Sequence, residues 1–259
     1  MDDNLLTKLC GENVTICDND VTNYFNLKSL ESKYYYISES NFYLQQNKNT
    51  FSILNINIRS LNKNFEDFKL LMHELNHDFK IICLTETWCK YDEHNLQFEL
   101  TNYASIHQPR NFRTGGGVCI FIHNSINFIP RNDLSVNEKD CESLCIEIIS
   151  QNSKNVIVNV IYREPAGNLK NFKAHLRTFL TKVIKKKKHV YLVGDLNINI
   201  LNHASNNSVK CFVNTLLQNN LIPTITKPTR ITKSSSTLLD NIITNNFFNG
   251  CFSTGIIKG

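Results

Sequence analysis

Short apolar runs that each end in polar side chains constrain the fold of this chain more than any other feature. Each run is rich in β-branched residues and is short enough to form one buried strand. In layered α/β folds, side chains at strand ends and in the loops that follow converge on one site. The runs are 51–57, 81–86, 156–162 and 190–197, and their polar side chains are Asn55, Asn57, Glu86, Tyr162, Asp195 and Asn197. With Asp240, this set offers carboxylates, carboxamides and a phenol, but no histidine.

The apolar periodicity along the rest of the chain predicts an α/β fold. Residues 64–76, 168–184 and 207–219 carry apolar side chains at helical spacing. Residues 142–149 and 155–162 are predicted to pair as antiparallel strands. Strands interleaved with helices indicate a four-layer sandwich, in which two packed mixed β-sheets are flanked by helices. The remaining predicted strands are 80–85, 118–123, 189–193 and 238–244.

The first 50 residues differ in composition from the rest. They are polar and rich in Asn, and they contain a Tyr34–Tyr36 cluster without a clear period. We therefore expect residues 1–50 to be a partly ordered leader, with one short helix near 39–46. Residues 51–259 are long enough to bury the core of one large domain.

Composition narrows the class of protein. The hydrophobic content of 41% and charged content of 20% are ordinary for a globular protein. No apolar run approaches the ~18 residues of a membrane span, and the amino terminus lacks the pattern of a signal peptide. Cys83, Cys119 and Cys145 lie in apolar runs and no CxxC pair occurs, which favours buried free thiols. We expect an intracellular protein, nuclear or cytoplasmic and not secreted, with no membrane partner.

Two strand ends have residues suited to acid–base or metal chemistry. In Gly194-Asp195-Leu196-Asn197, a carboxylate and a carboxamide follow an apolar run and could position a water; a turn with an Asx hydrogen bond is the alternative. Glu86 ends another run, and together with Asn57 it would suit Mg²⁺, which prefers few carboxylates and keeps several waters. The alternative for Glu86 is a surface residue that begins a loop.

The segment His73-Glu74-Leu75-Asn76-His77 has the HExxH pattern of zinc proteases. Both histidines fall opposite the apolar face formed by Phe68 and Met72. A third ligand is not evident either. We therefore expect His73 and His77 to be exposed to solvent and to bind no catalytic zinc.

Two further segments have simple structural interpretations. Lys185–Lys188 is typical of a solvated helix end, and contact with DNA is the alternative. Thr114–Gly117 is typical of a kink that opens a strand, and an anion-binding nest is the alternative. The net charge of +5 is compatible with a polyanionic partner.

The order of the motifs resembles that of the endonuclease/exonuclease/phosphatase superfamily, and most of all the apurinic-type endonuclease domain of non-LTR (LINE-type) retrotransposons. The resemblance covers the chain from about residue 51 to its end. The segments 55–61 and 227–232 point to the retrotransposon branch. The motifs, in order, are Leu54-Asn55-Ile56-Asn57, Thr85-Glu86-Thr87, Gly115-Gly116-Gly117-Val118, Ile161–Pro165, Gly194-Asp195-Leu196-Asn197 and Leu239–Ile242.

This resemblance implies a role for each polar residue. Asn57 and Glu86 match the Mg²⁺ site, with Mn²⁺ as a possible substitute, and Asn55 and Asn197 match groups that orient the phosphate and the water. Asp195 matches the acid that positions or deprotonates the attacking water. Tyr162 matches the phenol that hydrogen-bonds the phosphate, and Asp240 matches the acid that orients a catalytic histidine. DNA is the implied partner, and an intact relative is expected to carry a reverse transcriptase region as well.

In the family, the catalytic histidine lies in a Ser-Asp-His segment after a strand that resembles residues 253–257. No histidine of this chain follows His203. We therefore expect a sandwich whose C-terminal strand or strands are missing and whose DNA-nicking activity is impaired. The alternatives are a non-catalytic DNA-binding remnant or gene fragment, and another phosphoesterase of the same superfamily.

Overall fold

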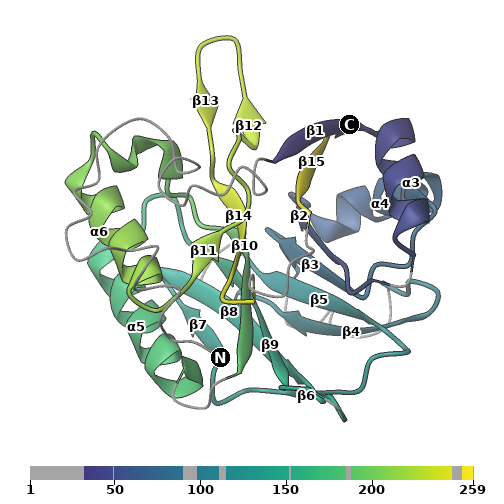
Figure 1. Cartoon of the computed structure of the whole chain (residues 1–259), viewed down its shortest axis with the longest axis horizontal. Helices are drawn as coiled ribbons and strands as arrows, with labels where there is room; N and C mark the ends of the chain where they lie inside the picture. The colour runs from purple at the N-terminus through teal and green to yellow at the C-terminus, as the bar shows by residue number, and fades with distance from the viewer. Residues whose placement is uncertain are drawn as a thin grey trace.

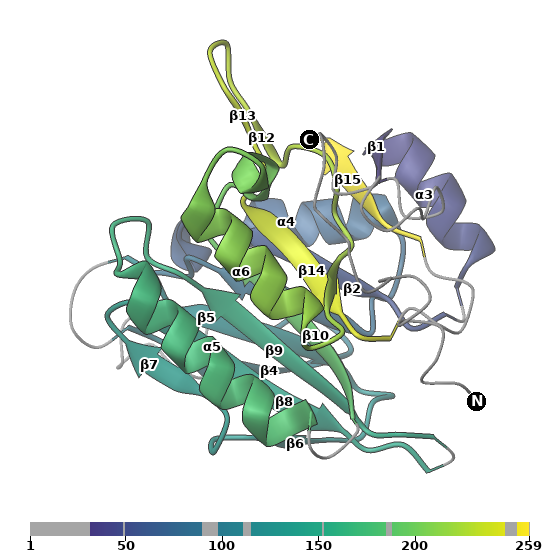
Figure 2. The ribbon, with the colours of Figure 1, turned by 60° about the vertical axis from the view of Figure 1, so that its left-hand side comes forward.

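Two β-sheets face each other at the centre of the molecule, and helices cover the outer face of each (Figures 1 and 2). This is the α/β sandwich that the sequence predicts. The computed structural model describes residues 32–48, 50–89, 98–110, 115–151, 153–184, 188–246 and 253–258.

The first sheet has the strand order β2-β3-β5-β4. Strand β2 runs parallel to β3, whereas β5 is antiparallel to both of its neighbours. Helix α4 covers the outer face through Phe65, Phe68 and Met72, which pack in one cluster with Leu84 and Phe121. The bounds of these elements are β2 Ile53–Asn57, α4 Leu61–Leu75, β3 Ile81–Thr85, β4 Tyr103–Gln108 and β5 Val118–His123.

The second sheet has the order β11-β14-β10-β9-β8-β6, with β7 also paired to β8. Helices α5 and α6 cover its outer face, and Phe172 and Phe212 from these helices are both fully buried there. Strands β8 and β9 are antiparallel, as predicted. The bounds are β6 Phe128–Pro130, β7 Val136–Glu138, β8 Cys141–Ile148, β9 Val156–Tyr162, α5 Leu169–Ile184, β10 His189–Asp195, the 3₁₀ helix η3 Ile200–His203, α6 Asn207–Leu217, β11 Ile222–Pro223 and β14 Asp240–Thr244.

The inner faces of the two sheets form a third apolar cluster. Side chains alternate along each strand, so Val158 and Val160 of β9 point inward while Ile157 and Ile161 point toward the outer helices. This alternation determines which polar residues at the strand ends face the space between the sheets.

A short hairpin and an N-terminal unit complete the described structure. Strands β12 (Arg230–Ile231) and β13 (Ser236–Thr237) form a hairpin that projects from the sandwich (Figure 1). Strand β1 (Lys33–Tyr36) pairs in parallel with β15 (Gly255–Lys258), so segments from opposite ends of the sequence lie side by side.

Helix α3 (Ile37–Gln46) contains the short helix expected near 39–46 and follows β1 directly. Its Ile37 and Leu44 pack on the cluster beneath α4. Ser32 is fully buried, and its hydroxyl donates a 3.0 Å hydrogen bond to the carbonyl of Thr224. The described part of the leader is therefore packed against the sandwich.

The expectation that both HExxH histidines are exposed was wrong for His77. Helix α4 ends at Leu75 because Asn76 adopts a left-handed conformation with φ of 45°. The backbone then turns His77 inward, where it is 6% exposed and its Nε2 lies 3.0 Å from the Ser52 hydroxyl. His73 remains exposed on the helix, so the two rings do not share a helical face.

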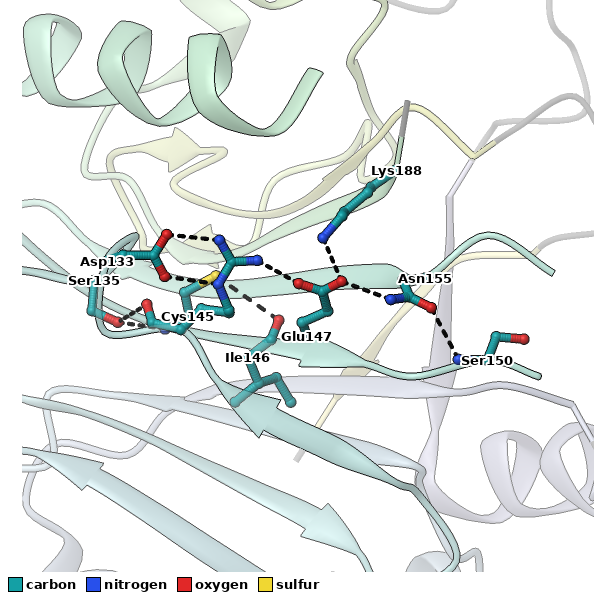
Figure 3. A network of polar contacts seen from close by, with 9 residues as sticks. Asp133, Ser135, Cys145, Ile146, Glu147, Ser150, Asn155 and Lys188 are labelled. Atoms are coloured by element: carbon teal, nitrogen blue, oxygen red, sulfur yellow. Dashed lines mark hydrogen bonds and ion pairs between the residues drawn. The ribbon is translucent and has the colours of Figure 1, made fainter. Parts of the chain in front are cut away.

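A polar network ties β8, β9 and β10 together at the end of the sheet that carries Lys188 (Figure 3). The buried Glu147 carboxylate accepts hydrogen bonds from Arg131, from Lys188 and, at 2.7 Å, from Asn155. Burial raises the pKa of Glu147, but these donors outweigh it and hold the pKa below its usual value. Lys188 therefore forms an ion pair with Glu147 and is not the solvated residue at a helix end that the sequence predicted. Residues 185–187 of the same predicted segment lie outside the described part of the chain.

The three cysteines that the sequence placed in apolar runs are buried free thiols. Burial raises the pKa of Cys83 and Cys119, which keeps both thiols protonated.

Within the described residues, no helix is both long and apolar enough to cross a membrane.

Candidate active site

Polar side chains from both sheets meet where their strands end, in the space between the sheets. Strand β2 contributes Asn55 and Asn57, which alternate with Leu54 and Ile56 on the outer face. Strand β10 contributes Asp195, which shares the inward parity of Val193. The periodicity of two in each strand therefore brings polar groups from opposite sheets together.

Strand register aligns the polar residues of the second sheet in one row. Asp195 of β10 pairs with Tyr162 of the parallel strand β9 and with Asp240 of the antiparallel strand β14. On the far side of Tyr162, the row continues to Glu142 of β8. A shift of one residue in any of these pairings would turn that side chain to the opposite face.

Asn57 joins the two sheets. Its amide nitrogen donates to Glu86 Oε1 at 2.8 Å and to Asp195 Oδ2 at 2.9 Å. Glu86 adopts a left-handed backbone conformation with φ of 55°, and its carbonyl accepts a hydrogen bond from Ser60. Three residues predicted from separate strand ends are thus in direct contact.

The Asp195 carboxyl is 4% exposed and its pKa is raised to about 7. Burial is the largest cause, followed by the negative charge of Asp240, while hydrogen bonds from Asn197 and Asn57 act in the opposite direction. A carboxyl group with a pKa near 7 can hold or release a proton at physiological pH.

Asp240 lies beside Asp195 and is held by Thr229. The Thr229 hydroxyl donates to Asp240 Oδ2 at 3.0 Å and accepts a hydrogen bond from the Asp240 backbone at 3.2 Å. Burial raises the pKa of Asp240, against the lowering effect of Thr229, Arg230 and Arg59. Among the residues that the structure describes, no histidine forms a hydrogen bond or ion pair with Asp240.

Tyr162 is 4% exposed, and Arg110 lies over its ring with 5.6 Å between the guanidinium carbon and the ring centroid. Burial and the charges of Glu86, Glu164 and Asp195 raise its pKa, so the phenol keeps its proton. Arg110 also pairs with Glu142 and, at 3.0 Å, with Glu164. The tyrosine is thus packed against a charged cluster and retains a donor O–H group.

Asn197 lies next to Asp195 but uses its side chain elsewhere. Its backbone N–H donates to Asp195 Oδ1 at 2.9 Å, which is the Asx-type turn considered from the sequence. Its amide nitrogen donates to the carbonyl of Arg163 at 2.7 Å, and Arg163 donates back to the Asn197 carbonyl at 3.0 Å. The side chain of Asn197 therefore fixes the loop after β9 in this structure.

Gly194 permits the close approach of β10 and β9 just before Asp195. Its φ is +143°, and a Cβ there would lie 2.1 Å from the carbonyl oxygen of Ile161. Only glycine fits such a position without a shift of the backbone. The glycine in the Gly-Asp motif therefore sets the direction in which Asp195 leaves the strand.

A cleft of about 580 Å³ borders the site, lined by Asn55, Asn57, Asp195 and Asp240 and by the two exposed cations Arg59 and Arg230. Glu86 reaches this group through Asn57 rather than through the cleft wall. Tyr162 lies in the same strand row as Asp195.

The donor set suits a hard cation bound largely through oxygen and water. Oδ1 of Asn55, Oδ1 of Asn57 and Oδ1 of Asp240 are buried without a hydrogen-bond partner among the described residues. Across those residues, no cluster of three His, Cys, Asp or Glu side chains is arranged to hold a metal. This combination of few carboxylates with amide oxygens is compatible with Mg²⁺, which keeps several of its waters.

The Endonuclease/Exonuclease/phosphatase family matches residues 54–254. The chain belongs to the endonuclease/exonuclease/phosphatase family. The match includes every residue of the site described above. No match was found among curated protein sequences.

Several solved nuclease structures have the same fold. The endonuclease domain of TRAS1, a telomere-specific non-LTR retrotransposon, has a TM-score of 0.56 at 12% identity, over 76% of this chain and 85% of that chain. The 3'-5' exonuclease NExo of Neisseria meningitidis has a TM-score of 0.54 at 16% identity, over 74% and 86%. An AP endonuclease of Archaeoglobus fulgidus has a TM-score of 0.52 at 11% identity, over 76% and 87%. At these identities the likeness shows the fold.

In this family member, the groups that support the predicted residues were not recognisable from the sequence. Thr229 lies in the 227–232 segment that was singled out, but its bond to Asp240 depends on folding. Arg110 and Glu142 carried no signal in the sequence, because Arg110 lies outside every predicted element and Glu142 begins a predicted apolar strand. Gly117, from the glycine run, donates its backbone N–H to the buried Glu142 carboxylate, so the run binds a carboxylate of the chain itself. Thr114 lies outside the described residues.

Proposed function

We propose that the chain is a Mg²⁺-dependent phosphodiesterase that nicks DNA, similar in role to the endonuclease domains of non-LTR retrotransposons. The observation that carries this proposal is the contact of Asn57 with both Glu86 and Asp195, beside Tyr162 and Asp240 in the same strand row. Phosphodiester hydrolysis needs a positioned water and stabilisation of charge on the phosphoryl oxygens. This set of side chains can supply both.

Glu86 and Asn57 are the residues that would hold Mg²⁺, or Mn²⁺ in its place. The buried Oδ1 of Asn57, which lacks a partner within the described chain, supports this assignment. A bound divalent cation supplies positive charge to the phosphoryl oxygens and to the leaving oxygen.

Asp195 is the group that we assign to the attacking water. Its carboxyl, with a pKa raised to about 7 by burial and by Asp240, can accept a proton from a water in the cleft. Tyr162 keeps its proton and can donate a hydrogen bond to a phosphate oxygen. Asn55 lines the same cleft and is assigned to orient the phosphate, and Asn197 holds the Asp195 loop.

DNA is the proposed substrate because two exposed cations, Arg59 and Arg230, line the cleft. Arg59 and Arg230 are exposed and close enough to Asp240 to lower its pKa. Arg230 begins the projecting β12–β13 hairpin, which also carries Lys233 at its turn (Figure 1). Such a cationic rim attracts a polyanionic backbone.

We further propose that the chain by itself nicks slowly. Asp240 Oδ1 has no partner among the described residues, and the family resemblance implies a histidine there. Loss of one transition-state hydrogen-bond donor costs about 10²–10³ in rate.

The test is a nicking assay on supercoiled plasmid with Mg²⁺, an EDTA control and the Asp195→Ala variant. We expect little nicked product with Mg²⁺ alone, and an increase of about tenfold or more when imidazole is added as a soluble substitute for the histidine. The increase should be absent with EDTA, in Asp195→Ala and in Asp240→Asn. Robust nicking without imidazole that Asp195→Ala abolishes would contradict the impairment and support the activity. No nicking under any condition would favour the non-catalytic DNA-binding alternative.

A further inference from the structure

Trp88 is the single tryptophan of the chain, and it is 46% exposed two residues after Glu86. Its neighbours Thr87 and Cys89 are 2% and 6% exposed, so the backbone turns this one side chain outward. Exposure of an indole leaves a large apolar surface in water. Its position beside a proposed cation ligand suggests that the indole has a partner outside the chain.

The backbone that presents Trp88 is strained and locked. Trp88 and Glu86 both have φ of 55°, a left-handed conformation that costs energy for residues other than glycine. The N–H of Trp88 donates to the carbonyl of Gly116 at 2.8 Å, and the N–H of Leu61 donates to the carbonyl of Thr87 at 2.8 Å. The glycine run on one side and the start of helix α4 on the other therefore hold the backbone from Thr87 to Trp88 in place.

The indole lies next to the glycine run, which connects it through Arg110 to Tyr162. Trp88 Nε1 is 3.9 Å from the position that a Cβ would take on Gly115, and the next residue, Gly116, lies directly against the Arg110 guanidinium. Arg110 in turn covers the ring of Tyr162. The cations Arg59 and Arg230 line the cleft together with Asp240, which is at the opposite side of Asp195 from Tyr162 in the strand row.

A nucleic acid whose phosphate lies over Asp195 would thus meet cations on one side and a flat apolar ring on the other. Stacking on an aromatic ring requires a base that is free of its own stack, so such a ring favours single-stranded or locally unpaired DNA over a regular duplex. An aliphatic side chain with the same exposure, such as Ile129 at 46%, offers no such plane.

We propose that Trp88 is a stacking platform for one unpaired nucleobase next to the scissile phosphate, and that the preferred substrate is DNA with an unstacked base at that position. This inference rests on the proposed function and specifies its substrate. The rigid loop is its physical basis, because a ring that is already ordered loses little freedom when a base stacks on it.

The test uses the emission of Trp88 in the full chain that carries Asp195→Asn, in EDTA, so that no DNA is cleaved. A single-stranded 12-mer of thymidine and a 12-base-pair duplex are titrated separately, while anisotropy of labelled copies measures binding. We expect the single strand to quench the emission and to bind more tightly than the duplex. Trp88→Ala should weaken single-strand binding by about 10- to 100-fold, and Trp88→Phe by less than about threefold.

Ile129→Ala is the matched control, because Ile129 has the same exposed fraction as Trp88. Its DNA binding should be unchanged, because Ile129 lies on strand β6, at the edge of the second sheet and not next to β10. Binding of the single strand with unchanged Trp88 emission would overturn the stacking inference and leave the proposed function standing. Tighter binding of the duplex, or an equal loss in Trp88→Phe and Trp88→Ala, would also overturn it. If neither the single strand nor the duplex binds, both the stacking inference and the proposed DNA-nicking function are overturned.

Discussion

Asp195 places an ionisable group where the protein interior opposes its charge. Its pKa of about 7 in the folded chain exceeds the ~3.9 of an unfolded aspartate, so the folded state binds more protons between these values. The free energy of unfolding therefore falls as pH rises from about 4 to about 7. A residue suited to accept a proton from water thus lowers the stability of the chain at neutral pH.

Asp195→Asn should therefore be more stable than the unmodified chain at pH 8, by about 1–3 kcal/mol, and show little difference near pH 4.5. The amide removes the buried charge that burial and Asp240 disfavour. Urea unfolding in EDTA at both pH values measures this difference. A gain that does not change with pH would show that Asp195 ionises normally in the folded chain.

Strand β10 passes close to β9 at Gly194, immediately before Asp195. Gly194→Ala combines an unfavourable φ of +143° with a Cβ that would lie 2.1 Å from the carbonyl oxygen of Ile161. We expect a loss of about 2–4 kcal/mol in the free energy of unfolding.

Gly115→Ala is the matched comparison, because its φ of +85° is also unfavourable but its nearest atom would be 3.9 Å away. That variant should lose only about 1 kcal/mol. Thermal unfolding of both variants separates backbone strain from steric overlap. Equal losses would show that the contact between Gly194 and Ile161 adds nothing.

At the scale of the whole molecule, the parallel pairing of β1 with β15 joins segments near the two ends of the described chain. A cavity of about 380 Å³ borders this pair and is lined by Tyr35 and Ile257 of the two strands and by Tyr43, Phe51 and Tyr191. Ser32 and helix α3 add buried contacts. Residues 32–48 therefore cover part of the sandwich.

A variant lacking residues 1–50 should unfold at a lower temperature than the full chain, because it loses the β1–β15 pair and the packing of Ile37 and Leu44. We expect a decrease of at least 5 °C, which corresponds to about 2 kcal/mol for a domain of this size. Differential scanning fluorimetry of the two chains is sufficient. An unchanged midpoint would support the proposed boundary near residue 50, with the leader as an appendage.

The sequence determined the elements and the parity of their polar side chains. Apolar runs and helical spacing predicted helices α4, α5 and α6 and strands β2, β3, β5, β8, β9, β10 and β14 within a few residues, because local hydrophobic periodicity is a property of each segment alone. Strand β4 and the short strands β6, β7 and β11 were not predicted. The same patterns located Asn57, Glu86, Tyr162, Asp195 and Asp240 at strand ends. Local geometry was less predictable, as His77 shows: a single left-handed residue at Asn76 turned it into the interior.

Only the tertiary structure decided which of these groups touch and what their chemistry becomes. The bridge of Asn57 to Glu86 and Asp195 spans two sheets, and the bond of Thr229 to Asp240 follows from a hairpin that turns back to β14. The raised pKa of Asp195 arises from burial and from a neighbour 45 residues away in sequence, since Asp240 lies beside it only through strand pairing. Contacts and desolvation depend on distances through space, and spacing along a sequence does not encode them.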